Sequence, residues 1–365
     1  MKTHPPDYIL LCTVVILIIL GILILASVST SYAQVKFGST FYFLNHQIIY
    51  GLLPGLILGI LAYKIPLPVL KKICLFLFLT NLIFLAIVFL PKIGSRLYGA
   101  SRWVDLGPFS FQPSEFLKVT FILYLSAWLV GIQEKNAKRT TKAFIAFFII
   151  IGVVGLILIL QPDISTLAII VAVGLLIYFL SDTPIWHTFL VSLIGLAILI
   201  PLINFTPYRI SRILVFLNPE ADPMGQGYQI KQALITAGSG GIFGLGLGMS
   251  RQKFGFLPES ISDAIFVIFA EETGFLGSTI LIILFLIFIW RGFVIAKRSA
   301  DSFSKFAALG VSIWIALQAF INIGGMISVL PVVGIPLPFV SYGGSALIAE
   351  LIGTGILLNI SKNTT

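Results

Sequence analysis

Four acidic residues stand at the borders of long apolar segments: Glu115, Asp163, Glu259 and Asp263. If the segment that begins at Pro258 is helical, Glu259 and Asp263 are four positions apart and share one face. An acid at a helix start often serves only as a cap or as a partner of the helix dipole. Acids at a membrane interface are also candidate functional groups, because a carboxylate can take a proton from a hydroxyl as a general base. Both interpretations stay open here, and Asp263 is the leading candidate for a base.

Basic residues gather in two stretches of the chain, 91–112 and 205–263. Arg209 and Arg212 are three positions apart and share a face if they are helical, and Glu115 can pair with a lysine three positions later. Such cations could stabilise negative charge that develops on a leaving oxygen. The alternative is that long loops cross a membrane regardless of their charge. The candidate cations are Arg102, Lys118, Arg209, Arg212 and Lys231.

Trp103 follows Arg102 in the first of these stretches. It is either an aromatic anchor at the membrane interface or an apolar platform for a sugar or a lipid chain beside the cations.

Other chemistries have little support in the sequence. The three histidines are scattered, and Cys12 and Cys74 both lie inside apolar runs, so neither a zinc site nor a disulfide is expected. The glycine-rich run at 238–248 has no phosphate-loop pattern, and close packing is the favoured interpretation. Glu271, Glu272 and Glu350 lie deep in apolar segments and are expected to be buried structural partners.

The composition identifies the elements that must position these residues. Of the 365 residues, 58% are hydrophobic and only 10% are charged, whereas soluble domains carry about 25% charged residues. The apolar runs do not alternate as barrel strands do, so we predict an all-α, polytopic membrane helix bundle in one domain, 1–365. Ten spans are expected, with a large external loop at 205–263 and a shorter one at 91–112. The spans are 8–28, 45–63, 72–90, 113–132, 143–160, 164–181, 185–204, 264–290, 304–328 and 341–360.

The distribution of basic residues predicts the orientation. The first apolar run is about twenty residues long, which exceeds a signal-peptide core, so it is expected to remain as a span. With the N-terminus inside, internal segments hold 13 of the 23 Lys and Arg residues. We therefore expect both termini in the cytoplasm and the two external loops outside.

Motifs along nearly the whole chain resemble those of the SEDS family, the RodA/FtsW peptidoglycan polymerases. Near the acid at 263 the pattern departs from the family's, with Ser262, Ala264, Ala270 and Thr273 at positions where other residues are common. Residues 246–253 look more like the division branch, FtsW. The motifs are GASRW at 99–103, FQPSE at 111–115, LQPD at 160–163, NPEADPMGQGYQ at 218–229, LPESISD at 257–263, AEETG at 270–274 and PLPFVSYGGS at 336–345.

The resemblance implies a glycosyltransferase that polymerises lipid II, the undecaprenyl-pyrophosphate-linked disaccharide-peptide, at the outer face of the cytoplasmic (inner) membrane. It implies inverting transfer during cell division or elongation, with Asp263 as the catalytic residue. Arg102, Trp103, Glu115 and Lys118 fall on the family's motif positions. The reaction would need no soluble cofactor, with or without help from a divalent cation such as Mg or Mn. The expected partners are a class B penicillin-binding protein, other divisome or elongasome membrane proteins and membrane lipid, and no nucleic acid.

Two other functions compete with this one. A flippase or transporter of the same precursor would show inverted repeats and charges at the membrane midplane. A scaffold in a division complex would explain the spans but not the external cations. No convincing repeat is found, and the charges lie mainly at the outer level, so the polymerase is preferred.

Overall fold

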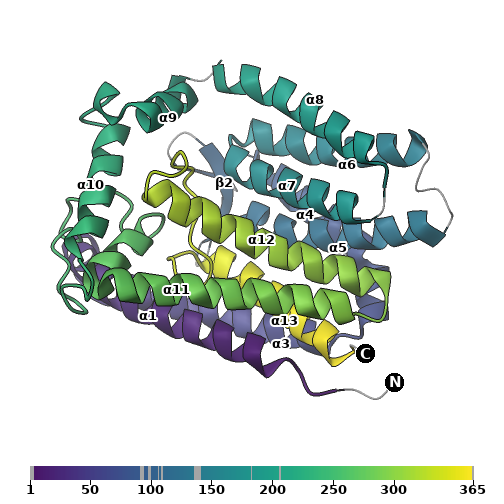
Figure 1. Cartoon of the computed structure of the whole chain (residues 1–365), viewed down its shortest axis with the longest axis horizontal. Helices are drawn as coiled ribbons and strands as arrows, with labels where there is room; N and C mark the ends of the chain where they lie inside the picture. Colours follow the sequence, from purple (N-terminus) through teal and green to yellow (C-terminus); the bar gives the residue numbers. More distant parts are fainter. Residues whose placement is uncertain are drawn as a thin grey trace.

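The structure, a computed structural model, describes residues 4–363 apart from 91–93, 98–99, 106, 108–109, 135–140, 182 and 205–206. It is a bundle of helices that run along the long axis of the molecule (Figure 1). Eight helices in the described part are long and apolar enough to cross a membrane, and two shorter apolar helices accompany them. The predicted helical membrane bundle is confirmed, while the count of ten spans stays a prediction.

The first third of the chain supplies three of the spans. α1 (Tyr8–Phe37) is capped by the Asp7 carboxylate, which accepts from the backbone N–H of Leu10, and it ends at Gly38 in the left-handed conformation. α2 (Tyr42–Gln47), a π-helical turn (Ile48–Leu52) and α3 (Leu53–Lys64) form the predicted second span. α4 (Leu67–Ile87) follows after a short turn.

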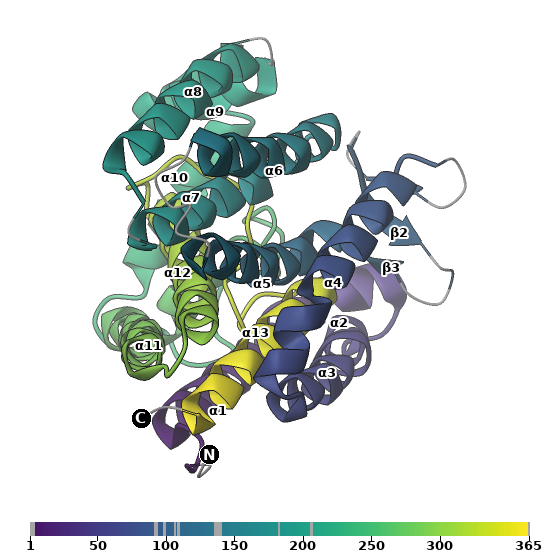
Figure 2. The same ribbon diagram turned by 90° about the vertical axis from the view of Figure 1, so that its right-hand side faces the viewer.

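The segment predicted as a loop at 91–112 contains a small antiparallel sheet, which the sequence did not indicate. β1 (Gly94–Leu97) pairs with β2 (Ala100–Asp105), and β2 pairs with β3 (Ser110–Phe111). β2 lies next to α4 and to the helix that follows the sheet, α5 (Pro113–Glu134), at the side of the bundle (Figure 2). Strands of six residues or fewer give too little alternation to be recognised between two strongly apolar spans.

The middle of the chain contains four helices and the long loop. These helices are α5 (Pro113–Glu134), α6 (Thr141–Leu160), α7 (Ile164–Leu180) and α8 (Ile185–Asn204). The loop predicted at 205–263 has its own structure. It contains α9 (Pro207–Leu217), a 3₁₀ turn (Pro219–Ala221) and α10 (Gln226–Ser239).

The last third of the chain contains three helices, of which α12 and α13 are the most buried of the candidate spans in the described residues. α11 (Ile265–Arg298) runs eight residues beyond its predicted end, and α12 (Ser302–Met326) returns beside it. α13 (Gly344–Lys362) begins three residues later than predicted and is buried along nearly its whole length. Between α12 and α13, residues 327–343 form an irregular segment that enters the protein, with Leu337, Phe339 and Val340 buried. We call it the reentrant segment.

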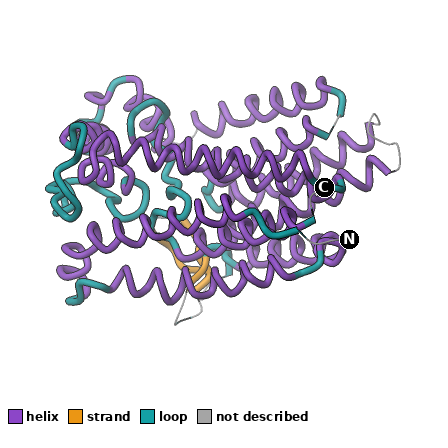
Figure 3. The backbone as a smooth tube through the Cα atoms, turned by 60° about the horizontal axis from the view of Figure 1, so that its bottom comes forward, coloured by secondary structure: helices purple, strands orange, loops and turns teal. Residues whose placement is uncertain are grey.

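Both ends of the chain meet at one end of the bundle. The backbone N–H of His4 donates to the carbonyl of Lys362, and the Arg291 guanidinium binds the Asp7 carboxylate at 2.5 Å. The helices α9 and α10 lie at the opposite end (Figure 1), where long loops also gather (Figure 3). The two termini thus lie at one end of the bundle and the long loop at the other, and the side of a membrane that each end faces stays a prediction.

The glycine-rich run packs against a break in α11. Gly274 leaves the helical conformation, with φ +69°, so α11 consists of two parts. A Cβ at Gly240 would lie 2.2 Å from the carbonyl oxygen of Ala270, and a Cβ at Gly244 would lie 2.2 Å from that of Glu272. Only glycine permits such close backbone approach, which confirms the packing interpretation.

The two acids beside this break are buried structural partners, as predicted. The Ser250 hydroxyl donates to the Glu271 carboxylate, and the Lys253 ammonium lies 3.3 Å from a carboxylate oxygen of Glu272. Ser27 of α1 also donates to Glu272, at 2.7 Å. These bonds tie the loop before α11 to the bundle and so fix the position of residues 250–264.

A candidate active site at the start of the eleventh helix

Asp263 lies directly before α11, at the end of the bundle opposite the chain termini, and is partly buried. Three successive carbonyl oxygens, those of 261–263, are held from the C-terminal part of the chain. The backbone N–H of Tyr342 donates to the first at 3.0 Å and the Ser341 hydroxyl to the second at 2.5 Å. The side-chain amide of Asn322 donates to the third at 2.9 Å. The backbone of Asp263 is therefore fixed by α12 and by the reentrant segment.

A small cavity adjoins the Asp263 carboxyl group. Its volume is about 180 Å³ including its open mouth, and its walls include Asn322, Gly334 and Ile335. Burial, followed by the nearby negative charge of Glu259, raises the pKa of Asp263 to about 6, against the opposing effect of the Arg212 guanidinium. A carboxylate with a pKa close to working pH is suited to take and release a proton.

Gly334 lies close to both the Asp263 carboxylate and the Arg212 guanidinium. A Cβ at this position would lie 3.3 Å from a carboxylate oxygen of Asp263 and 3.7 Å from a guanidinium nitrogen of Arg212. Its φ of +74° is also a conformation that favours glycine. Because Gly334 has no side chain, the Asp263 carboxylate and the Arg212 guanidinium can both lie close to its backbone.

Arg212 also faces a second, larger cavity. This cavity of about 400 Å³ lies between α9, α10 and the reentrant segment, and Gln226 and Gln229 contribute polar groups to its wall. The opposite face of α9 is apolar and exposed at Leu214 and Leu217, as expected of a helix lying at a membrane surface. Arg209 is on the same helix, but its side chain lies outside the described residues. Lys231 is on α10 and is exposed.

Side chains from neighbouring helices bind the backbone of the reentrant segment. Ser165 of α7 donates to the carbonyl of Val333 at 2.8 Å, and Asn322 of α12 donates to that of Ile335 at 2.7 Å. Gln318, one turn earlier on α12, donates to the carbonyl of Pro336 at 3.1 Å. Irregular backbone at membrane depth is stable only where its polar groups find such partners.

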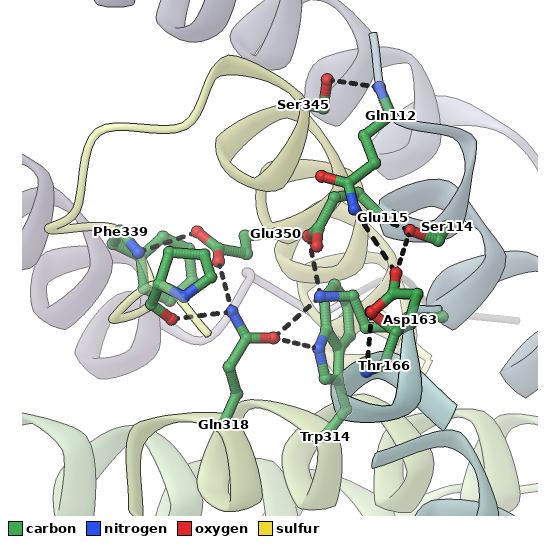
Figure 4. Close-up of polar contacts among 12 residues, drawn as sticks. Gln112, Ser114, Glu115, Asp163, Thr166, Trp314, Gln318, Phe339, Ser345 and Glu350 are labelled. Carbon is green, nitrogen blue, oxygen red and sulfur yellow. Dashed lines mark hydrogen bonds and ion pairs between the residues drawn. The ribbon is translucent and has the colours of Figure 1, made fainter. Parts of the chain in front are cut away.

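A buried ion pair lies beneath this segment. The Lys118 ammonium is 2.7 Å from the Glu115 carboxylate, and both side chains are almost fully buried. The ammonium also donates to the side-chain oxygen of Gln318 at 2.9 Å and lies 5.0 Å from the ring centre of Trp314. Figure 4 shows these groups converging from α5 and α12. Glu115 and Lys118 therefore pair as their spacing predicted, and buried partners balance the charge of the ammonium. A contact of Lys118 with a substrate stays a prediction.

Glu350 completes this network from α13, as its predicted burial required. One of its carboxylate oxygens accepts from the backbone N–H of Phe339 at 2.7 Å, and the other accepts from Gln318 at 3.4 Å (Figure 4). Gln318 thus connects the ion pair on α5, the acid on α13 and the backbone of the reentrant segment.

Asp163 is a buried helix cap. Its carboxylate accepts from the backbone N–H of Thr166 at 3.3 Å and from the Ser114 hydroxyl at 2.9 Å, with Gln112 also in reach (Figure 4). These contacts fit the structural alternative for this acid and join the starts of α5 and α7.

The remaining predicted residues have different surroundings. Arg102, on β2, donates to the carbonyls of Gln161 and Pro162, so it braces the junction of α6 and α7. Trp103 is on the same strand and partly buried. Glu259 is exposed, has a positive φ of 51° and accepts from the Ser262 hydroxyl at 2.9 Å.

The described residues contain no group of three or more His, Cys, Asp or Glu side chains that could hold a metal ion. The negative charge of Glu259 is near enough to contribute to the raised pKa of Asp263. Mg²⁺ commonly takes one or two carboxylates together with phosphate oxygens of a substrate. Glu259 with a bound diphosphate would fit a divalent cation in that way.

Three residues of this site were not predicted from the sequence: Gln318, Asn322 and Gly334. Two amide side chains four positions apart within an apolar span were a usable signal, because polar groups there need buried partners. Gly334 gave no signal, since its role depends on two side chains that are distant in the sequence.

Comparison with known proteins identifies relatives along the whole chain. A family model for the FtsW/RodA/SpoVE group, described as a cell cycle protein, matches residues 8–365. Stage V sporulation protein E of Bacillus subtilis is 38% identical, over 99% of this chain and 98% of that protein. The probable peptidoglycan glycosyltransferase FtsW of Coxiella burnetii is also 38% identical, over 98% and 96%.

Solved structures share the fold. A chain from a peptidoglycan synthase complex, described as coordinating polymerization and crosslinking, has a TM-score of 0.78 and 28% identity, covering 98% of this chain and 97% of that one. The rod shape determining protein RodA of Thermus thermophilus has a TM-score of 0.71 and 25% identity, with the same coverage of both chains.

Proposed function

The chain belongs to the FtsW/RodA/SpoVE family, and from that premise we propose that it is a peptidoglycan glycosyltransferase that polymerises lipid II at the outer face of the cytoplasmic membrane. The names of its sequence relatives favour a role in cell division or in the related process of sporulation. The enzyme is a multi-pass membrane protein.

The placement of Asp263 carries this proposal. Its backbone is bound from α12 and from Ser341, its carboxyl group faces a cavity, and its pKa is raised to about 6. A base must be ionised and yet close in pKa to the surrounding pH to transfer protons effectively, and general bases contribute about 100- to 10,000-fold in rate.

In the proposed reaction, a hydroxyl oxygen of the acceptor sugar attacks the anomeric carbon of the donor. Asp263 takes the proton of that hydroxyl. The bond between the anomeric carbon and the diphosphate oxygen breaks, with inversion, and the electron pair stays on the diphosphate. Arg212 is near enough to Asp263 to influence its charge and can stabilise the negative charge on the leaving oxygen. Arg209, Arg102 and Lys231 are further candidates for contact with the anionic substrate.

Glu115, Lys118 and Asp163 support the reaction from within the protein. The ion pair and the cap lie under the reentrant segment and at the starts of α5 and α7. Lys118 donates to Gln318, which binds the backbone of the reentrant segment, and Asp163 joins the starts of α5 and α7, so we assign these residues positioning roles. Glu259 modulates the charge of Asp263, and Trp103 offers an aromatic surface near the first external loop.

The proposed surroundings follow from the resemblance and the family. The termini lie in the cytoplasm, and a class B penicillin-binding protein supplies the crosslinking activity. An introduced cysteine replacing the exposed Ser239 should react with an impermeant reagent from outside the cell. Labelling only from the cytoplasmic side would contradict both the orientation and the function.

The direct test uses the purified full-length chain with labelled lipid II, alone and with its cognate penicillin-binding protein. We expect glycan strands, in larger amount with the partner. Movement of lipid II across a vesicle membrane without any glycan product would contradict the polymerase and support the transporter.

A further inference from the structure

Asn322 of α12 uses one end of its amide to organise the active site. Its nitrogen donates to the carbonyl oxygens of Asp263 and Ile335, at 2.9 and 2.7 Å. An amide nitrogen has two N–H donors, and both are engaged. The orientation of the amide is therefore determined, because turning it over would set its oxygen against two carbonyl oxygens.

The other end of the amide is an unpaired acceptor. The side chain is 4% exposed, and its oxygen is buried with no hydrogen-bond partner among the described residues. A buried polar atom without a partner costs about 1–3 kcal/mol. Asn322 is one of the residues that line the cavity at Asp263. Both N–H groups of its amide are already bound to backbone carbonyls, so its oxygen is the side-chain atom that remains able to accept a hydrogen bond from a ligand.

Gln318 shows that this is not a general property of amides in α12. Its oxygen accepts from Lys118 and from Trp314, and its nitrogen donates to Pro336 and to Glu350. Gln318 is a saturated structural group, whereas Asn322 one turn later retains capacity for a ligand.

The cavity selects what this oxygen can bind. Apart from Asp263 and Asn322 its walls are apolar side chains and glycines. Its interior holds about one water-sized group, so one hydroxyl of a sugar fits inside while the ring stays at the open mouth. Two acceptors side by side, one charged and one neutral, require donors. Adjacent hydroxyls of a sugar ring match them, since one can give its proton to the carboxylate while its neighbour donates to the amide oxygen.

We propose that the side-chain oxygen of Asn322 binds a hydroxyl of the acceptor sugar next to the hydroxyl that Asp263 deprotonates. Asn322 then orients the attacking oxygen and selects acceptors that carry the neighbouring hydroxyl. This inference rests on the proposed function.

The test pairs changes in the protein with changes in the acceptor. Full-length protein is supplied with labelled lipid II and either a normal lipid-linked acceptor or one of two analogues, each lacking a hydroxyl beside the attacking one. For the wild type, we expect one analogue to be extended at least tenfold more slowly, because a site that binds a hydroxyl discriminates strongly against its loss. Equal extension of all three acceptors by the wild type would overturn the inference without any variant.

The Asn322→Ala variant then identifies the residue responsible. We expect it to be slower with the normal acceptor but to treat the sensitive analogue and the normal acceptor alike. Gln318→Ala is the matched control, and it should be slower while keeping the wild-type preference. A preference that survives in Asn322→Ala overturns the assignment. A wild type that extends no acceptor at all contradicts the proposed function, and this inference with it.

Discussion

Replacing Asp263 by Asn separates the catalytic role of this acid from a structural one. The change keeps the shape of the side chain and leaves the backbone carbonyl free to accept from Asn322. Asp and Asn serve almost equally as caps at helix starts, so a purely structural Asp263 would tolerate the substitution. Asn cannot take a proton from a hydroxyl, and the loss of a general base should lower the rate by about 100- to 10,000-fold.

The structure also predicts the effect of this change on stability. The raised pKa of Asp263 means that the folded protein prefers the neutral carboxyl group. The stability that this preference gives is fully present below pH 3.8 and is lost as the pH rises through about 6. The difference between these values corresponds to at most about 3 kcal/mol, at about 1.4 kcal/mol per pKa unit, and partial exposure of the side chain reduces it. At neutral pH, Asp263→Asn should therefore be at least as stable as the wild type.

Two measurements on the purified protein test this reasoning. Glycan synthesis from labelled lipid II should be almost abolished in Asp263→Asn, while the Tm in detergent at pH 7.5 should be equal or higher. Wild-type activity should rise with pH through about 6, as the base loses its proton. Polymerisation by Asp263→Asn at a near wild-type rate would refute the base assignment, and a large fall in Tm would refute the account of its environment.

Three further predictions follow from the surrounding contacts. Glu115→Gln leaves the Lys118 ammonium buried without its carboxylate and should destabilise the protein by about 3–5 kcal/mol. The double variant Glu115→Gln, Lys118→Met should recover part of the lost Tm, and an unchanged Tm in the single variant would argue against the buried pair. Gly334→Ala places a methyl group 3.3 Å from the Asp263 carboxylate and should slow polymerisation at least tenfold. Gly38→Ala is the control: its φ is +67° and no atom lies within 4 Å of the added Cβ, so it should lower stability alone. Equal activities in the two variants would remove Gly334 from the site. Arg212→Ala should lower kcat/KM for lipid II. Arg212→Lys should restore only part of it, because lysine lacks the planar fork that suits phosphate oxygens. Wild-type kinetics in both variants would exclude Arg212 from the substrate site.

The sheet in the first external loop illustrates a limit of prediction from sequence. Its strands are short, and their pairing depends on contact with α4 and α5 rather than on a pattern within the loop. The ion pair is a second case. The spacing of Glu115 and Lys118 predicted that they would pair, but nothing local indicated that Gln318 and Trp314 would enclose the ammonium.

The sequence by itself determined the class of the protein and the position of its candidate base. A chain with 58% hydrophobic and 10% charged residues can only satisfy its backbone as membrane helices, and the period and length of the apolar runs locate most of them. The position of an acid at the border of such a run, as at Asp263, is likewise a local property. The sequence motifs also indicate the family to which the chain belongs.

Only the tertiary structure decided which of the polar residues work together. Asp263, Asn322 and Gly334 meet because the reentrant segment folds back against α12 and against the residues that precede α11, which no local pattern encodes. The same packing turned Lys118 and Asp163 inward, where their charge is used on buried partners. Electrostatic roles depend on burial and on neighbours distant in the chain, and these exist only once the helices have packed.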